Sequence, residues 1–191
     1  MNWYVLFVMT GYEQKILDEI SRTWRIDGLN PFIPMYEAIF KNAGRIHKEK
    51  RRLFPGYVFL ESDIAGTDFY MAARPYIIRS EHSLKLLRYG RGVDDKAFEM
   101  KEAEYQVLSK LYNKEHCVEM SKGLIVGDRA VITSGPLMGF ESCIKRVHGS
   151  KMEAVVEIEM MGAFREVKVG LEILDKIPAA DNIPNKCNSF F

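Results

Sequence analysis

The sequence predicts an α+β protein in which an N-terminal α/β sandwich is followed by a small β-barrel. Two observations carry this prediction. The first part of the chain alternates short apolar runs with stretches of helical period, whereas from Leu124 onward only short strands broken by glycines are indicated. Between them, residues 113–123 show no periodic apolar face. We therefore expect an N-terminal domain at 1–112, a linker at 113–123, a barrel at 124–177 and a disordered tail at 178–191.

The composition is that of an ordinary globular protein, with 47% apolar residues, 28% charged residues and a formal net charge of +1. No apolar run approaches the ~20 residues that cross a bilayer, and the opening Met1-Asn2-Trp3-Tyr4 lacks the basic start of a signal peptide. The three cysteines, Cys117, Cys143 and Cys187, form no metal-binding or disulfide spacing. We expect a cytoplasmic protein with reduced thiols and without a metal or another cofactor.

The N-terminal elements begin with an expected strand over residues 3–9, which are an unbroken apolar and aromatic run. Thr10 and Glu13 have the spacing of a capping box, which predicts a helix over residues 11–26. Its helical period shows in the apolar residues Ile16, Leu17, Ile20 and Trp24. After Asp27-Gly28 ends this helix, residues 35–40 are expected to form a second strand.

A basic run follows at residues 41–52, with six Lys or Arg side chains against one Glu and an Asn42-Ala43-Gly44 sequence typical of a hairpin tip. Such a run is commonly just a solvated hairpin, but concentrated cations are also what contact with phosphate groups requires. Further arginines follow in the same domain, and together they could hold an RNA hairpin if all share one face. The candidate RNA-binding residues are Lys41, Arg45, His47, Lys48, Lys50, Arg51, Arg52, Arg74, Arg79 and Arg88.

Residues 53–60 are a second apolar and aromatic run, which predicts a central strand. Because a strand alternates its faces, Tyr57 and Phe59 point to one side and Val58 to the other. One set can fill the core, the ordinary interpretation for aromatic residues, while the other leaves an apolar groove for a partner. Downstream, the pattern predicts a helix at 65–73, strands at 76–78 and 84–87, a helix start at Asp94-Asp95 and a long helix at 98–112.

The most informative pattern of the second half is Gly127-Asp128-x-x-Val131-x-x-x-Gly135-Pro136-x-x-Gly139. Its glycines supply positive φ at tight turns, and Gly135-Pro136 sets a corner between two strands. Any small β-barrel can use such turns, but the length and position of this pattern resemble the KOW motif in the C-terminal barrel of NusG and Spt5 proteins. Ser142 departs from that family, in which many members have glycine at this place.

The segment Leu53-Phe54-Pro55-Gly56-Tyr57-Val58-Phe59 closely resembles the Phe-Pro-Gly-Tyr-Val segment of the NusG N-terminal domain. With both motifs present in the right order, the chain resembles a transcription elongation factor of the NusG/Spt5 family over residues 2–177. The resemblance implies a NusG-type N-terminal domain that binds the clamp helices of bacterial RNA polymerase, followed by an SH3-like KOW barrel. It assigns polymerase binding to Phe7, Phe54, Tyr57 and Phe59.

Within that family, the chain is most similar to the specialised antitermination paralogues such as LoaP and RfaH, and to the LoaP type in particular. The similarity lies in the opening residues 3–11 and in the short connection from the basic run to Leu53. It implies read-through of terminators after recruitment by a hairpin in the nascent leader RNA, and contact of the barrel with a ribosomal protein or Rho. A barrel that refolds into helices, as in RfaH, is not expected, because residues 155–169 alternate like a strand and Gly162 interrupts any helix.

Catalysis is not expected from this sequence. The four histidines, His47, His82, His116 and His148, are scattered, and no nucleophile, phosphate-cradling or paired-carboxylate motif is present. Two other functions stay open: a general NusG-like elongation factor without RNA specificity, and a KOW-containing module that binds RNA or the ribosome. An aromatic groove distinguishes the last, since polymerase binding requires it and a ribosomal module does not.

Overall fold

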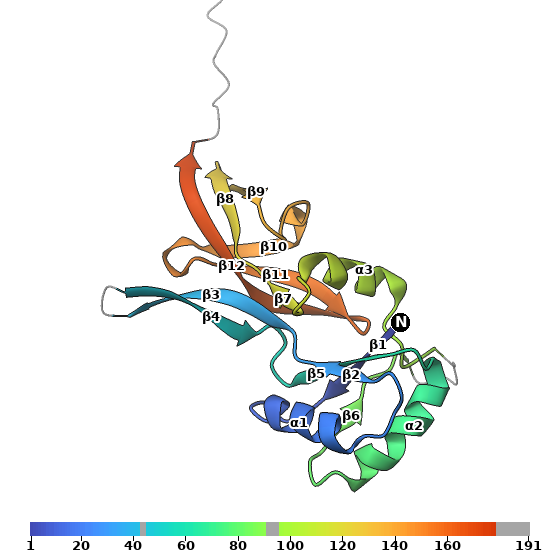
Figure 1. Cartoon of the computed structure of the whole chain (residues 1–191). Helices are drawn as coiled ribbons and strands as arrows, with labels where there is room; N and C mark the ends of the chain where they lie inside the picture. The colour runs from blue at the N-terminus through green and yellow to red at the C-terminus, as the bar shows by residue number, and fades with distance from the viewer. Residues whose placement is uncertain (43–44, 91–95, 179–191) are drawn as a thin grey trace, which may run out of the picture.

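A four-stranded antiparallel sheet forms the centre of the N-terminal part of the chain (Figure 1). The computed structural model describes residues 1–42, 45–90 and 96–178. The two middle strands are those that the apolar runs predict, and in their register Phe7 lies opposite Tyr57. In spatial order the strands are β2 (Asn30–Phe32), β5 (Tyr57–Ser62), β1 (Asn2–Phe7) and β6 (Lys85–Leu86).

Helices cover both faces of this sheet. On one face, α1 (Glu13–Thr23) and α2 (Gly66–Arg79) pack over an apolar core that includes Tyr4, whose ring stacks on Phe69. On the other face lies α3 (Glu102–Leu111), which packs against β1 through Tyr105 and Trp3. Because each face of the sheet is covered, both sides of β1 and β5 are largely buried, as their continuous apolar runs predict.

Two local predictions in this part are wrong. Thr10 does not cap α1, which begins at Glu13 without a side-chain cap. No strand forms at residues 76–78, because α2 continues through Pro75 to Arg79. Proline usually ends a helix, since it lacks an N–H and crowds the preceding turn. Here the last turn is held by Tyr76, whose ring stacks on Trp24 at 5.3 Å between centroids and whose hydroxyl accepts a hydrogen bond from the N–H of the residue after Trp24.

The basic run forms the outer strand of a long β-hairpin that projects from the sheet (Figure 1). In it, β3 (Met35–Asn42) pairs with β4 (Arg45–Arg52), and residues 43–44 lie outside the described residues. At its base, β7 (Cys117–Val118) adds to β3 in parallel, with both side chains buried. Residues 113–123 thus contain a buried strand where the sequence pattern indicates an irregular linker.

A five-stranded sheet makes up the rest of the chain, which confirms the α+β class with a β-rich second part. We call it the C-terminal sheet. Its longest strand, β12, pairs antiparallel with β11 along one half and parallel with β8 along the other. Two short 3-10 turns, η1 (Glu141–Cys143) and η2 (Gly149–Lys151), flank β10. In spatial order the strands are β10 (Ile144–His148), β11 (Glu153–Met160), β12 (Ala163–Ile177), β8 (Ser121–Val126) and β9 (Arg129–Ser134).

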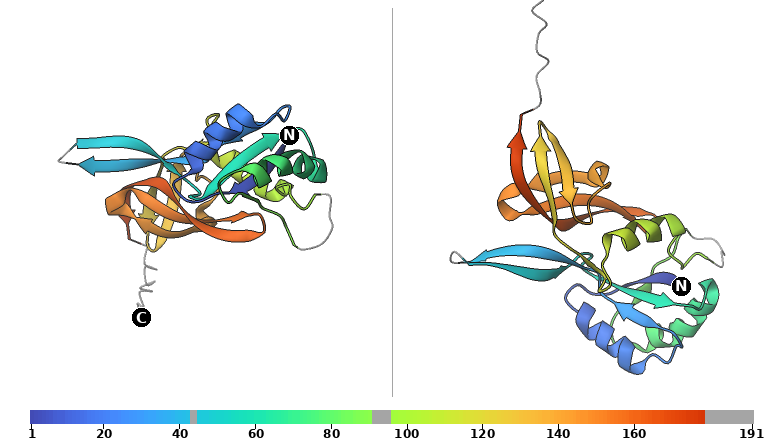
Figure 2. Two further views of the ribbon diagram at one scale, coloured as in Figure 1. Left: turned by 90° about the horizontal axis from the view of Figure 1, so that it is seen from below. Right: turned by 45° about the horizontal axis from the view of Figure 1, so that its top comes forward.

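The C-terminal sheet packs against the N-terminal part, as all views in Figures 1 and 2 show, and the two share one apolar core that contains both Phe59 and Val169. Strand β12 passes so close to β3 that Gly170 has no room for a side chain. A Cβ there would lie 2.5 Å from the carbonyl oxygen of Glu37 and would collide with Met120. The Glu37 carboxylate also accepts a hydrogen bond of 2.9 Å from the Met120 N–H. The two parts therefore meet in a close, specific contact.

No helix within the described ranges is long and apolar enough to cross a membrane. The expected helix start at Asp94-Asp95 and the expected tail after residue 178 fall outside the residues that the structure describes.

Candidate functional site

The four residues assigned to polymerase binding lie together near the end of β1 and the start of β5, but at two depths. Phe7 and Tyr57 have ring centroids 5.6 Å apart, and Phe7 is 42% exposed. Phe54 and Phe59 stack on each other with centroids 5.8 Å apart and are only 2% and 0% exposed. We call the four residues the aromatic face, with Phe7 and Tyr57 as its outer part and Phe54 and Phe59 as its inner part.

The turn between Phe54 and Tyr57 is anchored to α1 by the buried carboxylate of Glu13. This carboxylate accepts hydrogen bonds from the Gly56 N–H at 2.7 Å and the Gly11 N–H at 2.8 Å, and it lies 3.3 Å from the Arg52 guanidinium. Gly56 has a φ of 87°, a conformation that glycine adopts without strain. Helical spacing alone could not show this role of Glu13, because Gly56 and Arg52 lie far from it along the chain.

The C-terminal sheet covers part of the aromatic face. The guanidinium of Arg165, near the start of β12, lies over the Tyr57 ring at 5.1 Å from its centroid. The inner residues Phe54 and Phe59 belong to the apolar core that this sheet shares with the N-terminal part. Beside Arg165, Phe164 is 71% exposed. In the outer part of the aromatic face Phe7 is thus open to solvent and Tyr57 is half-buried, whereas the inner part is closed.

A buried carboxylate on α3 fixes the C-terminal sheet in this position. Glu104 is 4% exposed, and it accepts hydrogen bonds from the backbone N–H groups of Met161 at 2.7 Å and Gly162 at 3.0 Å, which form the turn between β11 and β12. It also accepts a hydrogen bond of 2.8 Å from the hydroxyl of Tyr89. Burial raises the pKa of the Tyr89 phenol and the bond to Glu104 raises it further, so this hydroxyl remains a donor. We call this arrangement the Glu104 clasp.

The cations of the basic hairpin are mostly ion-paired at the surface. A hydrogen bond to Glu115 raises the pKa of Lys50, and the same contact lowers the pKa of Glu115. Exposed pairs of this kind contribute little to stability, so their cations can exchange a carboxylate for a phosphate at small cost. The side chains of Lys41 and Arg45 lie outside the described residues. The surface pairs are His47–Glu49, Lys48–Glu37, Lys50–Glu115 and Arg51–Glu49, whereas Arg52 pairs with the buried carboxylate of Glu13.

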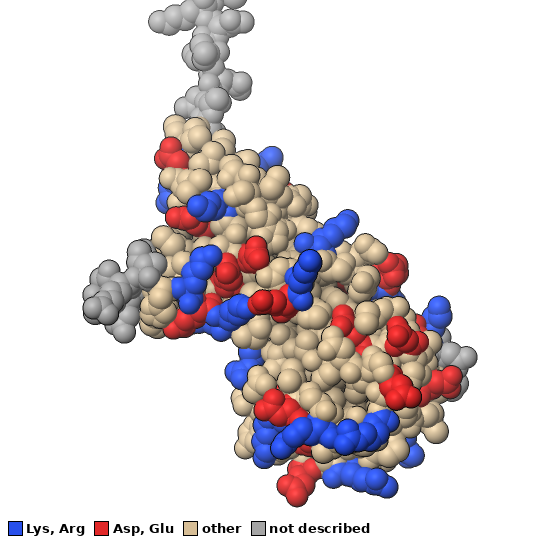
Figure 3. All heavy atoms as spheres, viewed as in Figure 1, with Lys and Arg blue, Asp and Glu red and all other residues tan. Residues whose placement is uncertain are grey.

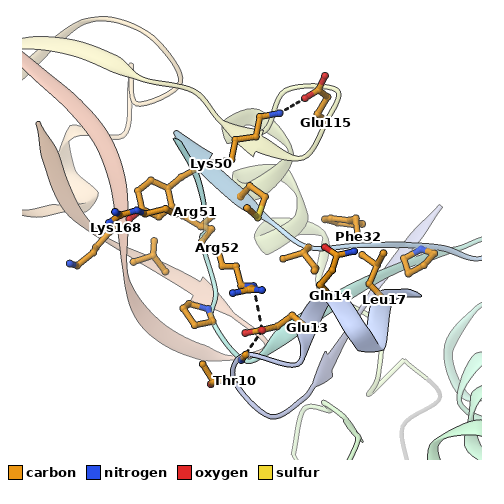
Figure 4. A pocket seen from close by; sticks show the side chains of 18 of the residues that line it. Thr10, Glu13, Gln14, Leu17, Phe32, Lys50, Arg51, Arg52, Glu115 and Lys168 are labelled. Atoms are coloured by element: carbon orange, nitrogen blue, oxygen red, sulfur yellow. Dashed lines mark hydrogen bonds and ion pairs between the residues drawn. The ribbon is translucent and has the colours of Figure 1, made fainter. Parts of the chain in front are cut away.

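A cavity of about 970 Å³ opens between α1, β4 and β12 (Figure 4). Apolar side chains that include Leu17 and Phe32 line it, together with four cations, Lys50, Arg51, Arg52 and Lys168. Three carboxylates line it as well, those of Glu13, Glu115 and Glu166. Because the two signs nearly cancel, the cavity suits a polypeptide of mixed charge better than a polyanion.

The predicted RNA-binding arginines that follow the basic run in the sequence do not lie beside the hairpin. They are Arg74, Arg79 and Arg88. Arg74 and Arg79 lie on α2, at the opposite end of the N-terminal part from the hairpin in all views of Figures 1 and 2. The Arg88 guanidinium lies over the Phe98 ring, 5.2 Å from its centroid. Figure 3 shows Lys and Arg side chains gathered over the end of the molecule formed by α1 and α2. The sequence gives no sign of this second group, because only the packing of the helices brings such cations onto one surface.

The glycines of the motif at residues 127–139 occupy turns, as the sequence predicts. Gly127-Asp128 is a two-residue connection between β8 and β9, and Gly127, Gly135 and Gly139 have φ angles of 59°, 98° and 82°. At Gly135-Pro136, which follows β9, a Cβ on the glycine would lie 2.6 Å from the Ser121 Cα. This corner therefore packs directly against the start of β8.

The histidines of the described residues lie apart from one another. His47 contacts Glu49 on the hairpin, whereas His116 stacks on Phe32 and lies 3.3 Å from Glu61. Among the described residues, no group of three or more His, Cys, Asp or Glu side chains could hold a metal ion.

Together, the fold and these surfaces define a two-part α+β protein that presents an aromatic face on its N-terminal sheet and a projecting basic hairpin. The family model described as "Transcription termination factor nusG" matches residues 1–109, more than half of the chain. The chain belongs to the NusG family.

Curated relatives match along nearly the whole chain at low identity. A protein of Pasteurella multocida is 21% identical over 181 residues, which cover 92% of this chain and 94% of the relative. One of Staphylococcus epidermidis is 22% identical over 184 residues, covering 92% and 96%, and one of Haemophilus influenzae is 22% identical over 182 residues, covering 92% and 94%. Each of these relatives is named "Transcription termination/antitermination protein NusG".

Proposed function

We propose that this chain is a transcription elongation and antitermination factor that binds the clamp helices of RNA polymerase and promotes read-through of terminators. Family membership and the names of the relatives support the general role in transcription. The observation that supports polymerase binding is the outer part of the aromatic face, where Phe7 and Tyr57 are in contact and Phe7 is open to solvent. Aromatic anchors of this kind contribute much of the binding energy of protein interfaces.

The mechanism needs only a modest energy. A factor that binds the active polymerase more tightly than the paused polymerase shifts the population toward the active state. A differential binding energy of about 1.4 kcal/mol changes the ratio of the two states tenfold. Binding at the clamp would supply this difference by holding the polymerase cleft closed, which disfavours the paused states from which termination begins.

The C-terminal sheet and the polymerase would compete for the inner part of the aromatic face. Phe54 and Phe59 become accessible only if the contact of Arg165 with Tyr57 and the Glu104 clasp are released. The polymerase would therefore meet Phe7 and Tyr57 first and then displace the sheet. On this proposal residues 1–112 and 124–177 act as two domains, and the released KOW-type domain contacts a ribosomal protein or Rho.

Recruitment by leader RNA is the second part of the proposal. The support for it is the hairpin formed by β3 and β4, whose outer strand carries Lys48, Lys50 and Arg51 in ion pairs at the surface. Lys48, Lys50 and Arg51 can turn to the phosphates of a nascent RNA hairpin, whereas Arg52 is held by the buried Glu13 carboxylate. A general elongation factor would lack this preference, so the response to leader RNA distinguishes the two.

Co-purification with core RNA polymerase tests the proposed binding site. The Phe7→Ala/Tyr57→Ala double variant should bind polymerase at least about 30-fold more weakly, since loss of one interface anchor costs about 2 kcal/mol. Phe54 and Phe59 are unsuitable for this test because both are core residues. The control is the Met71→Ala/Ile78→Ala double variant, which removes two exposed apolar side chains from α2. Equal recovery of polymerase with both double variants and the unaltered chain would exclude the aromatic face.

A further inference from the structure

A second cleft lies between the basic hairpin and the C-terminal sheet, on the side where η2, the start of β11 and the middle of β12 face β3 and β4. Its volume is about 340 Å³. This is near the lower limit for ligand sites, which suits one nucleotide better than a duplex. Neither part of the chain forms the cleft alone. The lining residues that matter here are Tyr36, Phe40, Arg51, Lys151, Glu153 and Lys168.

The charge of this cleft is positive, unlike that of the larger cavity beside α1. Three cations, Arg51, Lys151 and Lys168, line it against one carboxylate, that of Glu153, which lies 3.2 Å from the Lys168 ammonium. Arg51 is 3.6 Å from Glu49, at the surface, and Lys151 has no ion pair among the described residues. One cation is thus unpaired and another is weakly paired, which favours an anionic ligand.

An exposed aromatic ring stands among these cations. Phe40 is 39% exposed, the Arg51 guanidinium lies 5.2 Å from its ring centroid, and the His47 ring lies 5.6 Å away. Aromatic rings and guanidinium planes are the surfaces on which proteins stack unpaired bases, with nearby cations on the phosphates. An exposed aromatic ring beside an unpaired lysine matches both requirements of a single strand.

We propose that this cleft binds a single-stranded segment of RNA, with an unpaired base on Phe40 and the adjacent phosphates on Arg51 and Lys151. The inference rests on the proposed function in one respect, that RNA is a partner of the chain. It adds that the C-terminal sheet supplies part of the RNA site through Lys151, and that the RNA is unpaired at this point, as in a loop or a bulge. Sequence-selective proteins usually recognise RNA at such places.

Fluorescence anisotropy of the full chain with a fluorescein-labelled 12-nucleotide single-stranded uridine RNA tests this assignment. Lys151→Gln and Phe40→Leu should each weaken binding about tenfold, because each removes one kind of contact with the strand. Lys151→Gln should also lower the slope of log affinity against log salt by about 0.7, the share of one phosphate contact in a single strand. Both side chains are exposed, so circular dichroism should show unchanged folding.

The matched controls are Arg129→Gln, an exposed cation of β9, and Lys48→Gln, a hairpin cation that does not line this cleft. Unchanged affinity for Arg129→Gln beside a tenfold loss for Lys151→Gln supports the cleft. If Lys48→Gln weakens binding while Lys151→Gln and Phe40→Leu do not, RNA binds the other face of the hairpin, and only this inference fails. Tighter binding of a 12-base-pair RNA duplex than of the single strand, or no binding of the single strand, overturns it as well. Polymerase co-purification does not depend on Lys151, so the proposed polymerase binding is tested separately.

Discussion

Truncating the Glu104 side chain to a methyl group, Glu104→Ala, removes the carboxylate of the Glu104 clasp. The turn between β11 and β12 should then be released from α3. The substitution leaves three donors without their partner: the N–H groups of Met161 and Gly162 and the hydroxyl of Tyr89. Loss of one buried, charged partner of such a group costs about 2–5 kcal/mol. We take about 3 kcal/mol, since water can reach the turn once it opens, and this corresponds to a roughly 150-fold larger open population.

Hydrogen exchange of the Met161 and Gly162 amides measures this population directly. Both amides should lose protection by a factor of roughly 100 in Glu104→Ala, while amides in the centre of β1 keep theirs. The control is Glu102→Ala on the exposed side of the same helix, where the carboxylate accepts a hydrogen bond from the Gln106 side chain. Equal protection of the two amides in both variants would refute the reasoning that Glu104 holds the sheet in place.

The Glu104→Ala variant also tests the proposed competition between the C-terminal sheet and the polymerase. If the C-terminal sheet competes with polymerase for the inner part of the aromatic face, opening the Glu104 clasp removes part of the cost of displacing the sheet. Glu104→Ala should therefore bind polymerase more tightly than the unaltered chain does. Weaker binding would mean that the polymerase recognises the closed arrangement.

Three further predictions concern the contact between the two parts and the turns of the C-terminal sheet. Gly170→Ala should lower the free energy of unfolding in urea by about 1–3 kcal/mol, because the new Cβ meets the Glu37 carbonyl oxygen at 2.5 Å; an unchanged midpoint would mean that β12 and β3 can separate freely. Gly135→Ala should cost about 2 kcal/mol or more in the same assay, since it combines a φ of 98° with a contact of 2.6 Å to Ser121, and a stable variant would show that the corner can rearrange. Burial tends to raise the pKa of Glu37, but the hydrogen bond from the Met120 N–H and the Lys48 ammonium lower it below the ordinary 4.5. A lowered native pKa stabilises the fold above about pH 4.5, and this stabilisation is lost as the pH falls through the native pKa. The melting temperature of Glu37→Gln should thus lie below that of the unaltered chain at neutral pH and approach it below pH 4.5; a constant difference would contradict the assigned pKa.

Much of the fold could be predicted from the sequence because its signals are local. The apolar runs place β1 and β5, and the helical period places α1 and α3 to within a few residues. The glycines at 127 and 135 mark turns because each needs a positive φ. By contrast, α2 extends through Pro75 because Tyr76 finds a partner in Trp24, a contact between distant residues that no local pattern contains.

The sequence indicates which residues make up the aromatic face, but not how deeply each of them is buried. Strand alternation places Tyr57 and Phe59 on the same side of β5. That Phe59 is buried while Phe7 stays exposed depends on the C-terminal sheet, whose Arg165 covers Tyr57 and whose Val169 shares a core with Phe59. These contacts join residues far apart along the chain.

The arginines on α2 illustrate the same limit. Their position in the same domain predicts that Arg74 and Arg79 share a face with the hairpin cations, but the fold carries α2 to the other end of the N-terminal part. Conversely, Phe40 and Lys151 lie on one cleft although the sequence gives no sign of it. Composition can indicate a charge, whereas only the packing of the two parts shows which charges share a face.

Single-round transcription through an intrinsic terminator, with purified bacterial RNA polymerase and templates with or without the native leader, tests the central claim most directly. We predict that the unaltered chain raises read-through on the template with the leader, and that Phe7→Ala/Tyr57→Ala removes this effect while Met71→Ala/Ile78→Ala retains it. Equal read-through with and without the leader would identify a general elongation factor. Read-through that is unaffected by the chain on both templates, or unchanged in the Phe7→Ala/Tyr57→Ala variant, would contradict antitermination through the aromatic face.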